Sequence, residues 1–151
     1  MSPSAEPERP PLRSSLLLGT AAMTLVFAIA KVVAVSTSTD THPLQMPWLV
    51  YLMAVLLAVL VGARIGRARD TDLIATAVRH FLVLLSGIAL GVVVWVVLEE
   101  QVLRRLSGGT APLYMEHAAP MEVGIILGAS ILPAVLGMGV GLLLGRFWRP
   151  A

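Results

Sequence analysis

The chain of 151 residues is too apolar for a soluble domain, since 57% of its residues are hydrophobic and only 13% are charged. Soluble domains average about 45–50% and about 25%, and a fold of this size buries only about two thirds of the surface that its unfolded chain exposes. The composition therefore requires lipid as a solvent. The net charge of +2 comes from arginines clustered at segment ends, which indicate membrane topology and not a nucleic-acid partner. The absence of cysteine excludes disulfides and thiolate metal sites.

Four long apolar runs follow a proline-rich start, residues 1–13, whose composition is typical of a disordered tail. Each run approaches the roughly 20 residues that a helix needs to cross about 30 Å of hydrocarbon, and backbone groups in lipid must be paired within their segment. We therefore expect an all-α integral membrane domain over 14–148, an antiparallel up-down bundle, and a short tail at 149–151. The expected transmembrane helices are 14–36, 46–63, 79–98 and 121–145, with an outer loop at 99–120.

The positions of the arginines predict the orientation. Eight lie in the tails or between the second and third spans, two lie between the third and fourth, and none lies between the first and second. An excess of basic residues marks cytoplasmic loops. We therefore expect both termini in the cytoplasm and the chain in the inner (cytoplasmic) membrane. The eight are Arg9, Arg13, Arg64, Arg67, Arg69, Arg79, Arg146 and Arg149.

The first span also has features of a cleavable secretory signal. Arg9 and Arg13 precede an apolar stretch, and Ala28-Ile29-Ala30 mimics a cleavage site. Cleavage would leave three spans and an external N-terminus. The apolar run resumes after Lys31 and reaches full membrane length, which favours an uncleaved span.

Glycines at four-residue spacing predict close helix packing. Residues four apart share a helix face, and backbones without side chains there approach closely. At about 1.5 Å per residue, the glycine faces of spans 3 and 4 overlap in the inner leaflet, which predicts a tight antiparallel hairpin. Alternatively, the span-4 face binds another subunit or a second copy. The glycines are Gly87 and Gly91 in span 3 and Gly137, Gly141 and Gly145 in span 4, where Gly124 and Gly128 precede them.

Lys31 is the only charge well inside a span, about five residues from its outer end. A lysine at this depth either snorkels towards the outer surface or pairs with an acid in the bundle. Glu99, Glu100 and Glu122 are the candidates, because all three are expected at the same outer level. A Lys31 pair with Glu99 or Glu122 would be a buried lock or a coupling site.

Three further residues lie within or beside the expected spans. Arg79 and His80, at the inner boundary of span 3, are expected to snorkel as anchors, and the alternative is an inner-mouth ligand or proton site. Pro133 cannot donate a hydrogen bond to the carbonyl of Ala129 and bends span 4. A freed carbonyl lines the ion path in some transporters, whereas a static kink is the simpler interpretation.

The outer loops contain imidazole and thioether groups that suit transition metals. His42, Met115, His117 and Met121 are the weak candidates, because no repeated ligand spacing accompanies them. A solvated acidic loop is the simpler interpretation, and no cofactor is predicted.

The sequence shows no catalytic motif, so an enzyme is not expected. The leading hypothesis is a small inner-membrane accessory or assembly subunit that docks on a larger membrane complex through glycine-rich helix faces. The alternative is a small oligomeric ion or solute transporter or channel, with a path lined by Lys31, Glu122, Pro133, Arg79 and His80. A periplasmic-face metal-handling protein is the third. Expected partners are membrane lipid and either a second copy or a larger complex.

Overall fold

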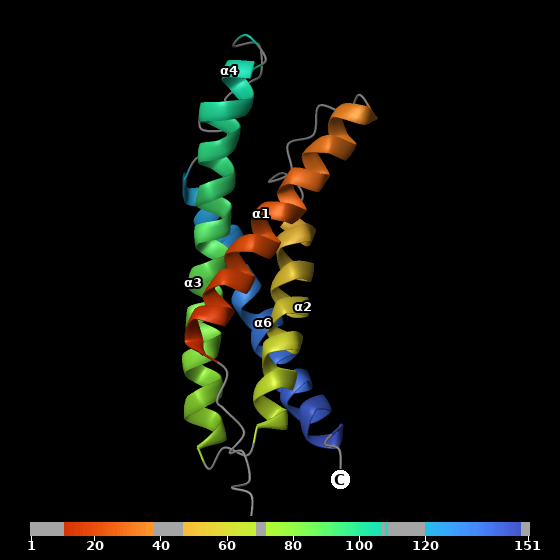
Figure 1. Ribbon diagram of the computed structural model, residues 1–151, viewed down its shortest axis with the longest axis vertical. Helices are drawn as coiled ribbons and strands as arrows, with labels where there is room; N and C mark the ends of the chain where they lie inside the picture. The colour runs from red at the N-terminus through yellow and green to blue at the C-terminus, as the bar shows by residue number, and fades with distance from the viewer. Residues whose placement is uncertain (1–10, 38–46, 69–71, 107, 109–119, 149–151) are drawn as a thin grey trace, which may run out of the picture.

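The computed structural model describes residues 11–37, 47–68, 72–106, 108 and 120–148. Within these ranges four helices are long and apolar enough to cross a membrane, as the hydrophobic runs predict. The third continues without a break into a π-helical segment, η2, and a short last turn, α4 (Figure 1). The elements are α1 (Leu12–Ser36), α2 (Pro47–Arg67), α3 (Leu73–Leu98), η2 (Glu99–Leu103), α4 (Arg104–Leu106) and α6 (Pro120–Phe147).

The helices extend beyond the apolar runs that predict them. The second continues to Arg67, and the third begins at Leu73, six residues before Arg79. A helix satisfies its backbone groups equally well in the headgroup region, so a basic turn does not end it. Pro47 and Pro120 are the first residues of α2 and α6, where the missing N–H of proline leaves no helical bond unmade.

The four helices form two close pairs, α1 with α3 and α2 with α6, and contacts between the pairs are much sparser (Figure 1). On α1, Thr20 Oγ1 donates to the Gly87 carbonyl at 3.1 Å and Thr24 Oγ1 to the Gly91 carbonyl at 3.3 Å. Later residues of α1 contact later residues of α3, so the two helices run parallel. The α2–α6 pair is parallel by the same criterion, because Val55, Val59 and Ala63 meet Gly137, Gly141 and Gly145 in turn.

The expected tight hairpin of spans 3 and 4 is wrong. A Cβ added to Gly87 would lie 2.5 Å from the Leu16 carbonyl oxygen, so this glycine faces α1. A Cβ on Gly137 would lie 2.8 Å from the Val55 carbonyl oxygen, so the span-4 glycines face α2. Glycine spacing identifies a face that packs closely, but it carries no information about which helix packs there.

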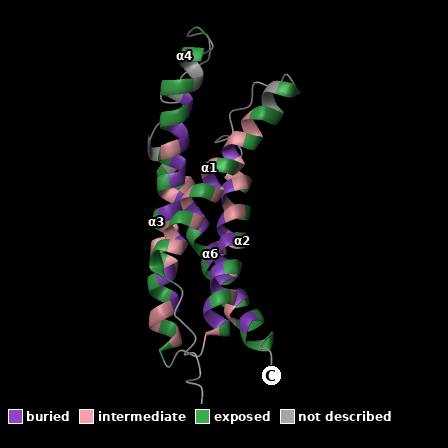
Figure 2. Ribbon diagram, in the orientation of Figure 1, coloured by how far each residue is buried: buried purple, intermediate pink, exposed green. Residues whose placement is uncertain are grey.

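The buried side chains lie on the inward faces of all four helices, and large apolar side chains cover the outward faces (Figure 2). Such outward leucine, isoleucine and valine side chains are stable in hydrocarbon, where burying them against protein brings no hydrophobic gain. The core of the described residues includes Met23, Phe27, Leu57, Ile65, Leu84, Ile88, Val92, Ala134 and Met138.

Candidate functional site

Polar side chains follow the contact between α1 and α3 along its whole length. Ser15, Thr20, Thr24 and Lys31 follow one another along α1, and each bonds to a group on α3 or on Glu99, where η2 begins. This row, together with His80 and Glu99 on α3, is called the α1–α3 seam below. Because the interior of a bilayer offers no water to polar groups, each of these contacts also holds the two helices together.

At the end of the seam that the arginine pattern predicts to be outside, called the outer end below, Lys31 Nζ lies 2.9 Å from Glu99 Oε1. The Glu99 side chain is only 6% exposed and that of Lys31 27%, so the structure has the paired arrangement rather than a lysine that only snorkels. The side chain of Glu122, the other expected partner, lies outside the described part. A carboxylate buried to this extent is stable as an anion only beside a cation.

Glu99 is also the residue at which α3 changes from α-helix to π-helix. Its backbone N–H donates to the carbonyls of both Trp95 and Val96, which are bonds of α-helical and 3₁₀ spacing, so Glu99 still ends α3 as a helical residue. Single π-helical turns are rare and are frequent at functional sites. The sequence carried no signal for this turn, because EEQVL is an ordinary helical composition.

Trp95 lies one turn before Glu99 and packs its ring against Phe27 of α1, with centroids 6.3 Å apart and planes tilted by 53°. Its indole nitrogen is buried and has no acceptor among the residues that the structure describes. Tryptophan near the end of a membrane span usually lies at the interface with water. The side chain instead points into the protein and is 3% exposed.

At the inner end of the seam, His80 Nδ1 and Ser15 Oγ form a buried hydrogen bond of 2.8 Å. The expectation that His80 snorkels as an anchor is therefore wrong. Arg79, its neighbour, is exposed, as an anchor should be. Consecutive residues point about 100° apart on a helix, and of these two it is His80 that faces α1. The hydropathy pattern at this boundary could not distinguish them.

The middle of the seam is closely packed. A Cβ on Gly19 would lie 2.9 Å from the Leu84 carbonyl oxygen, and one on Gly91 would lie 2.8 Å from the Thr20 carbonyl oxygen. Both threonine hydroxyls also bond to carbonyls of their own helix. The seam is thus a polar helix contact with ionisable groups at its two ends, and backbone fills the space between them.

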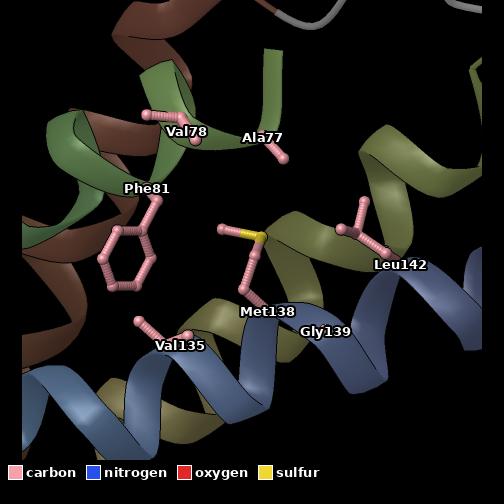
Figure 3. A pocket seen from close by; sticks show the side chains of 7 residues that line it. All are labelled: Ala77, Val78, Phe81, Val135, Met138, Gly139 and Leu142. Carbon is pink, nitrogen blue, oxygen red and sulfur yellow. The ribbon is translucent and has the colours of Figure 1, made fainter. Parts of the chain in front are cut away.

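A second feature is the groove between α3 and α6, called the α3–α6 groove, where two open cavities follow one another. The inner cavity has a volume of about 250 Å³ and the outer about 280 Å³. Figure 3 shows Phe81 and Val78 of α3 facing Val135 and Met138 of α6 across the inner cavity. From Gly128 to Leu142 the groove is about 21 Å long at 1.5 Å per residue, which exceeds one leaflet of about 15 Å.

Small residues make up half of the lining of the outer cavity, and leucine and isoleucine make up the other half. Ser86 and Ala89 contribute from α3, and Gly128 and Ser130 from α6. A Cβ on Gly124, Gly128 or Gly139 would meet no atom within 4 Å, in contrast to the glycines packed against α2. Sequence reasoning missed the groove, because it arises from the separation of two helix pairs and not from a motif.

Pro133 lies inside α6, as expected, and its ring leaves the Ala129 carbonyl without its usual amide partner. Ser130 does not compensate for this carbonyl, since its hydroxyl donates to Leu127 at 2.6 Å. The freed carbonyl belongs to an exposed residue next to Gly128, beside the groove.

Four residues were predicted as metal ligands of the outer face. His42, Met115 and His117, together with the side chain of Met121, lie outside the described residues. Among the described residues, no group of three or more histidine, aspartate or glutamate side chains could hold a metal ion.

Comparison of the chain with known protein families, with characterised proteins and with solved structures finds no match. The seam and the groove are therefore the observations from which a function can be argued.

Proposed function

We propose that the chain is a small accessory or assembly subunit that docks another membrane protein on its α3–α6 groove. The observation that supports this proposal is the open outer cavity, with Ala89, Gly128 and Ser130 around it. Lipid supplies no hydrophobic drive for association, so membrane helices associate where small residues let backbones approach closely.

The docking face is not the glycine face that the sequence suggested. Gly137, Gly141 and Gly145 are in contact with α2 and are not accessible to a partner. Gly124 and Gly128 have the same spacing and lie open on the outer half of α6. A partner helix on this pair would cross α6 at about 40°, the usual angle for such motifs, and would contact mainly the outer half. A partner hydroxyl there can donate to the freed Ala129 carbonyl.

Substitution of Gly128 by leucine is expected to weaken the complex with the partner about tenfold without unfolding the subunit. The added side chain occupies the docking space, and overpacking of a contact costs about 1–3 kcal/mol, where 1.4 kcal/mol is tenfold. The measurement is quantitative co-purification from native membranes in mild detergent, with a photocrosslinker at Ala89 to identify the neighbour. Ala21→Leu on the exposed face of α1 is the matched control. If the protein purifies as a monomer without a partner, and Gly128→Leu does not change this result, the proposal is contradicted.

In the proposed topology both termini are cytoplasmic and the four helices run up and down in the inner membrane. The basic last turn of α2, with Arg64 and Arg67, and the basic last turn of α6, with Arg146, support it. Two reporter enzymes can be fused after Arg67, one that is active only in the cytoplasm and one that is active only in the periplasm. We expect activity from the cytoplasmic form alone. Activity of the periplasmic form at this position would reverse the orientation.

The Lys31–Glu99 pair supports a second candidate function, that of a small oligomeric transporter. Ionisable groups within a membrane often mark substrate or proton paths, and here His80 and Glu99 lie at opposite ends of one seam. Since the seam itself is closely packed, the path would lie between protomers. Ion or proton flux in proteoliposomes that is lost in Glu99→Gln and kept in Arg105→Gln would favour transport. If the flux is equal in both variants and in vesicles without protein, the transport function is contradicted.

A further inference from the structure

We infer that the inner half of the α3–α6 groove binds an anionic phospholipid of the cytoplasmic leaflet, with its acyl chain in the inner cavity and its phosphate on Arg146. The inference rests on the proposed orientation, in which the C-terminus is cytoplasmic, but not on the docking proposal. A partner that crosses at the outer glycine pair diverges from α6 towards the cytoplasm and leaves the inner half open.

The inner cavity suits a hydrocarbon chain. All seven residues that line it are apolar or glycine, and Phe81 and Met138 form its two walls (Figure 3). Gly139 leaves space on the α6 side, since a Cβ there would meet nothing within 4 Å. The lining residues are Ala77, Val78, Phe81, Val135, Met138, Gly139 and Leu142.

Arg146 lies on the same stripe of α6 as the cavity. Val135, Gly139, Leu142 and Arg146 follow at intervals of four, three and four residues, which places them on one helix face. Arg146 belongs to the last turn of α6, is exposed, and forms no ion pair with any acidic side chain in the described ranges. A guanidinium binds phosphate oxygens in a bidentate manner, so a headgroup is its natural partner here.

The spacing of these groups matches one leaflet. From Arg146 to Val135 the helix rises about 16 Å, and half of a 30 Å hydrocarbon core is about 15 Å. A phosphate at Arg146 therefore puts the first methylenes beside Leu142 and the chain end near Val135. Phe147 and Trp148, both exposed, lie next to Arg146 where aromatic side chains favour the headgroup boundary. The cytoplasmic leaflet also carries the anionic lipids that basic residues attract.

Lipid retention by the purified full-length protein tests the site. The protein is delipidated in detergent, titrated with phosphatidylglycerol or phosphatidylcholine of identical chains, and examined by native mass spectrometry. We expect retention of one phosphatidylglycerol with about fivefold preference, the factor for about 1 kcal/mol per basic residue. Arg146→Gln is expected to remove the preference, and Gly139→Leu to reduce retention of both lipids by filling the cavity.

Arg79→Gln is the matched control. Arg79 is exposed on the part of α3 that lines the cavity, but it lies two residues before Phe81 and so points to another side of the helix. Loss of preference in Arg79→Gln equal to that in Arg146→Gln overturns the site in favour of general charge attraction. Equal retention of the two lipids also overturns it. Glycerol phosphate without acyl chains is expected not to bind, and binding with equal affinity would indicate a free anion site instead. If Gly139→Leu loses the bound lipid but still co-purifies with the partner protein, the lipid site is separate from the docking surface.

Discussion

Gly141→Leu is expected to destabilise the protein by about 3 kcal/mol, the largest effect of any single glycine substitution in α6. A Cβ at this position collides with the carbonyl oxygen of Val59 and lies 2.9 Å from the amide nitrogen of Ala63. Both neighbours are backbone atoms, so no side-chain rotation relieves the overlap and α2 has to move. Overpacking of a tight core costs about 1–3 kcal/mol, and a backbone collision belongs at the upper end. The measurement is the free energy of unfolding in a mixed-micelle denaturant titration.

Gly124→Leu provides the control for this experiment. It introduces the same side chain into the same helix at a site where a Cβ has no neighbour within 4 Å. Its free energy of unfolding should stay within about 0.5 kcal/mol of the wild type, as for other exposed sites. Equal loss in the two variants would show that α2 and α6 are not in the contact described. Gly141→Leu is consequently unsuitable as a test of docking, because loss of a partner would follow from loss of the fold.

Lys31→Met is expected to cost about 3 kcal/mol of stability, because it removes the cation that lies 2.9 Å from the buried Glu99 carboxylate. Removal of one partner of a buried pair costs about 3–5 kcal/mol, and the lower end applies because the Lys31 side chain is 27% exposed. Loss of the pair also frees the outer end of α1 from the π-helical turn that begins at Glu99. The same denaturant titration, performed in detergent at neutral pH, measures the effect.

The double variant Lys31→Met/Glu99→Leu distinguishes the pair from either residue alone. Replacement of both charges by apolar groups removes the desolvation penalty, and such replacements are often neutral or stabilising. The double variant should therefore recover most of the stability that Lys31→Met loses. If the two substitutions simply add, or if Lys31→Met has no effect, Lys31 snorkels to the surface in solution and the ion pair contributes nothing to the fold.

Both experiments bear on parts of the fold that the sequence predicted incompletely. The ionic partner of Lys31 was limited to a few glutamates by depth alone, since helical rise places all of them at one level. The choice of Glu99 depends on α1 lying beside α3. In the same way, His80 and Arg79 have equivalent positions in the hydropathy pattern. His80 contacts Ser15 because α1 lies on the side of α3 to which His80 points.

The amino-acid sequence by itself determined that the chain has four membrane-length helices, where they lie along the chain, and that certain glycine faces pack closely. These properties are local, because hydrophobic length and backbone pairing depend on one segment at a time. Tertiary structure alone decided that α1 pairs with α3 and α2 with α6, and thereby produced the seam, the Lys31–Glu99 pair and the groove. Several helix faces in this chain carry small residues and could each pack against more than one other helix. In lipid no hydrophobic effect between helices favours one of these pairings over another, so the pairing follows from the packing of the whole bundle.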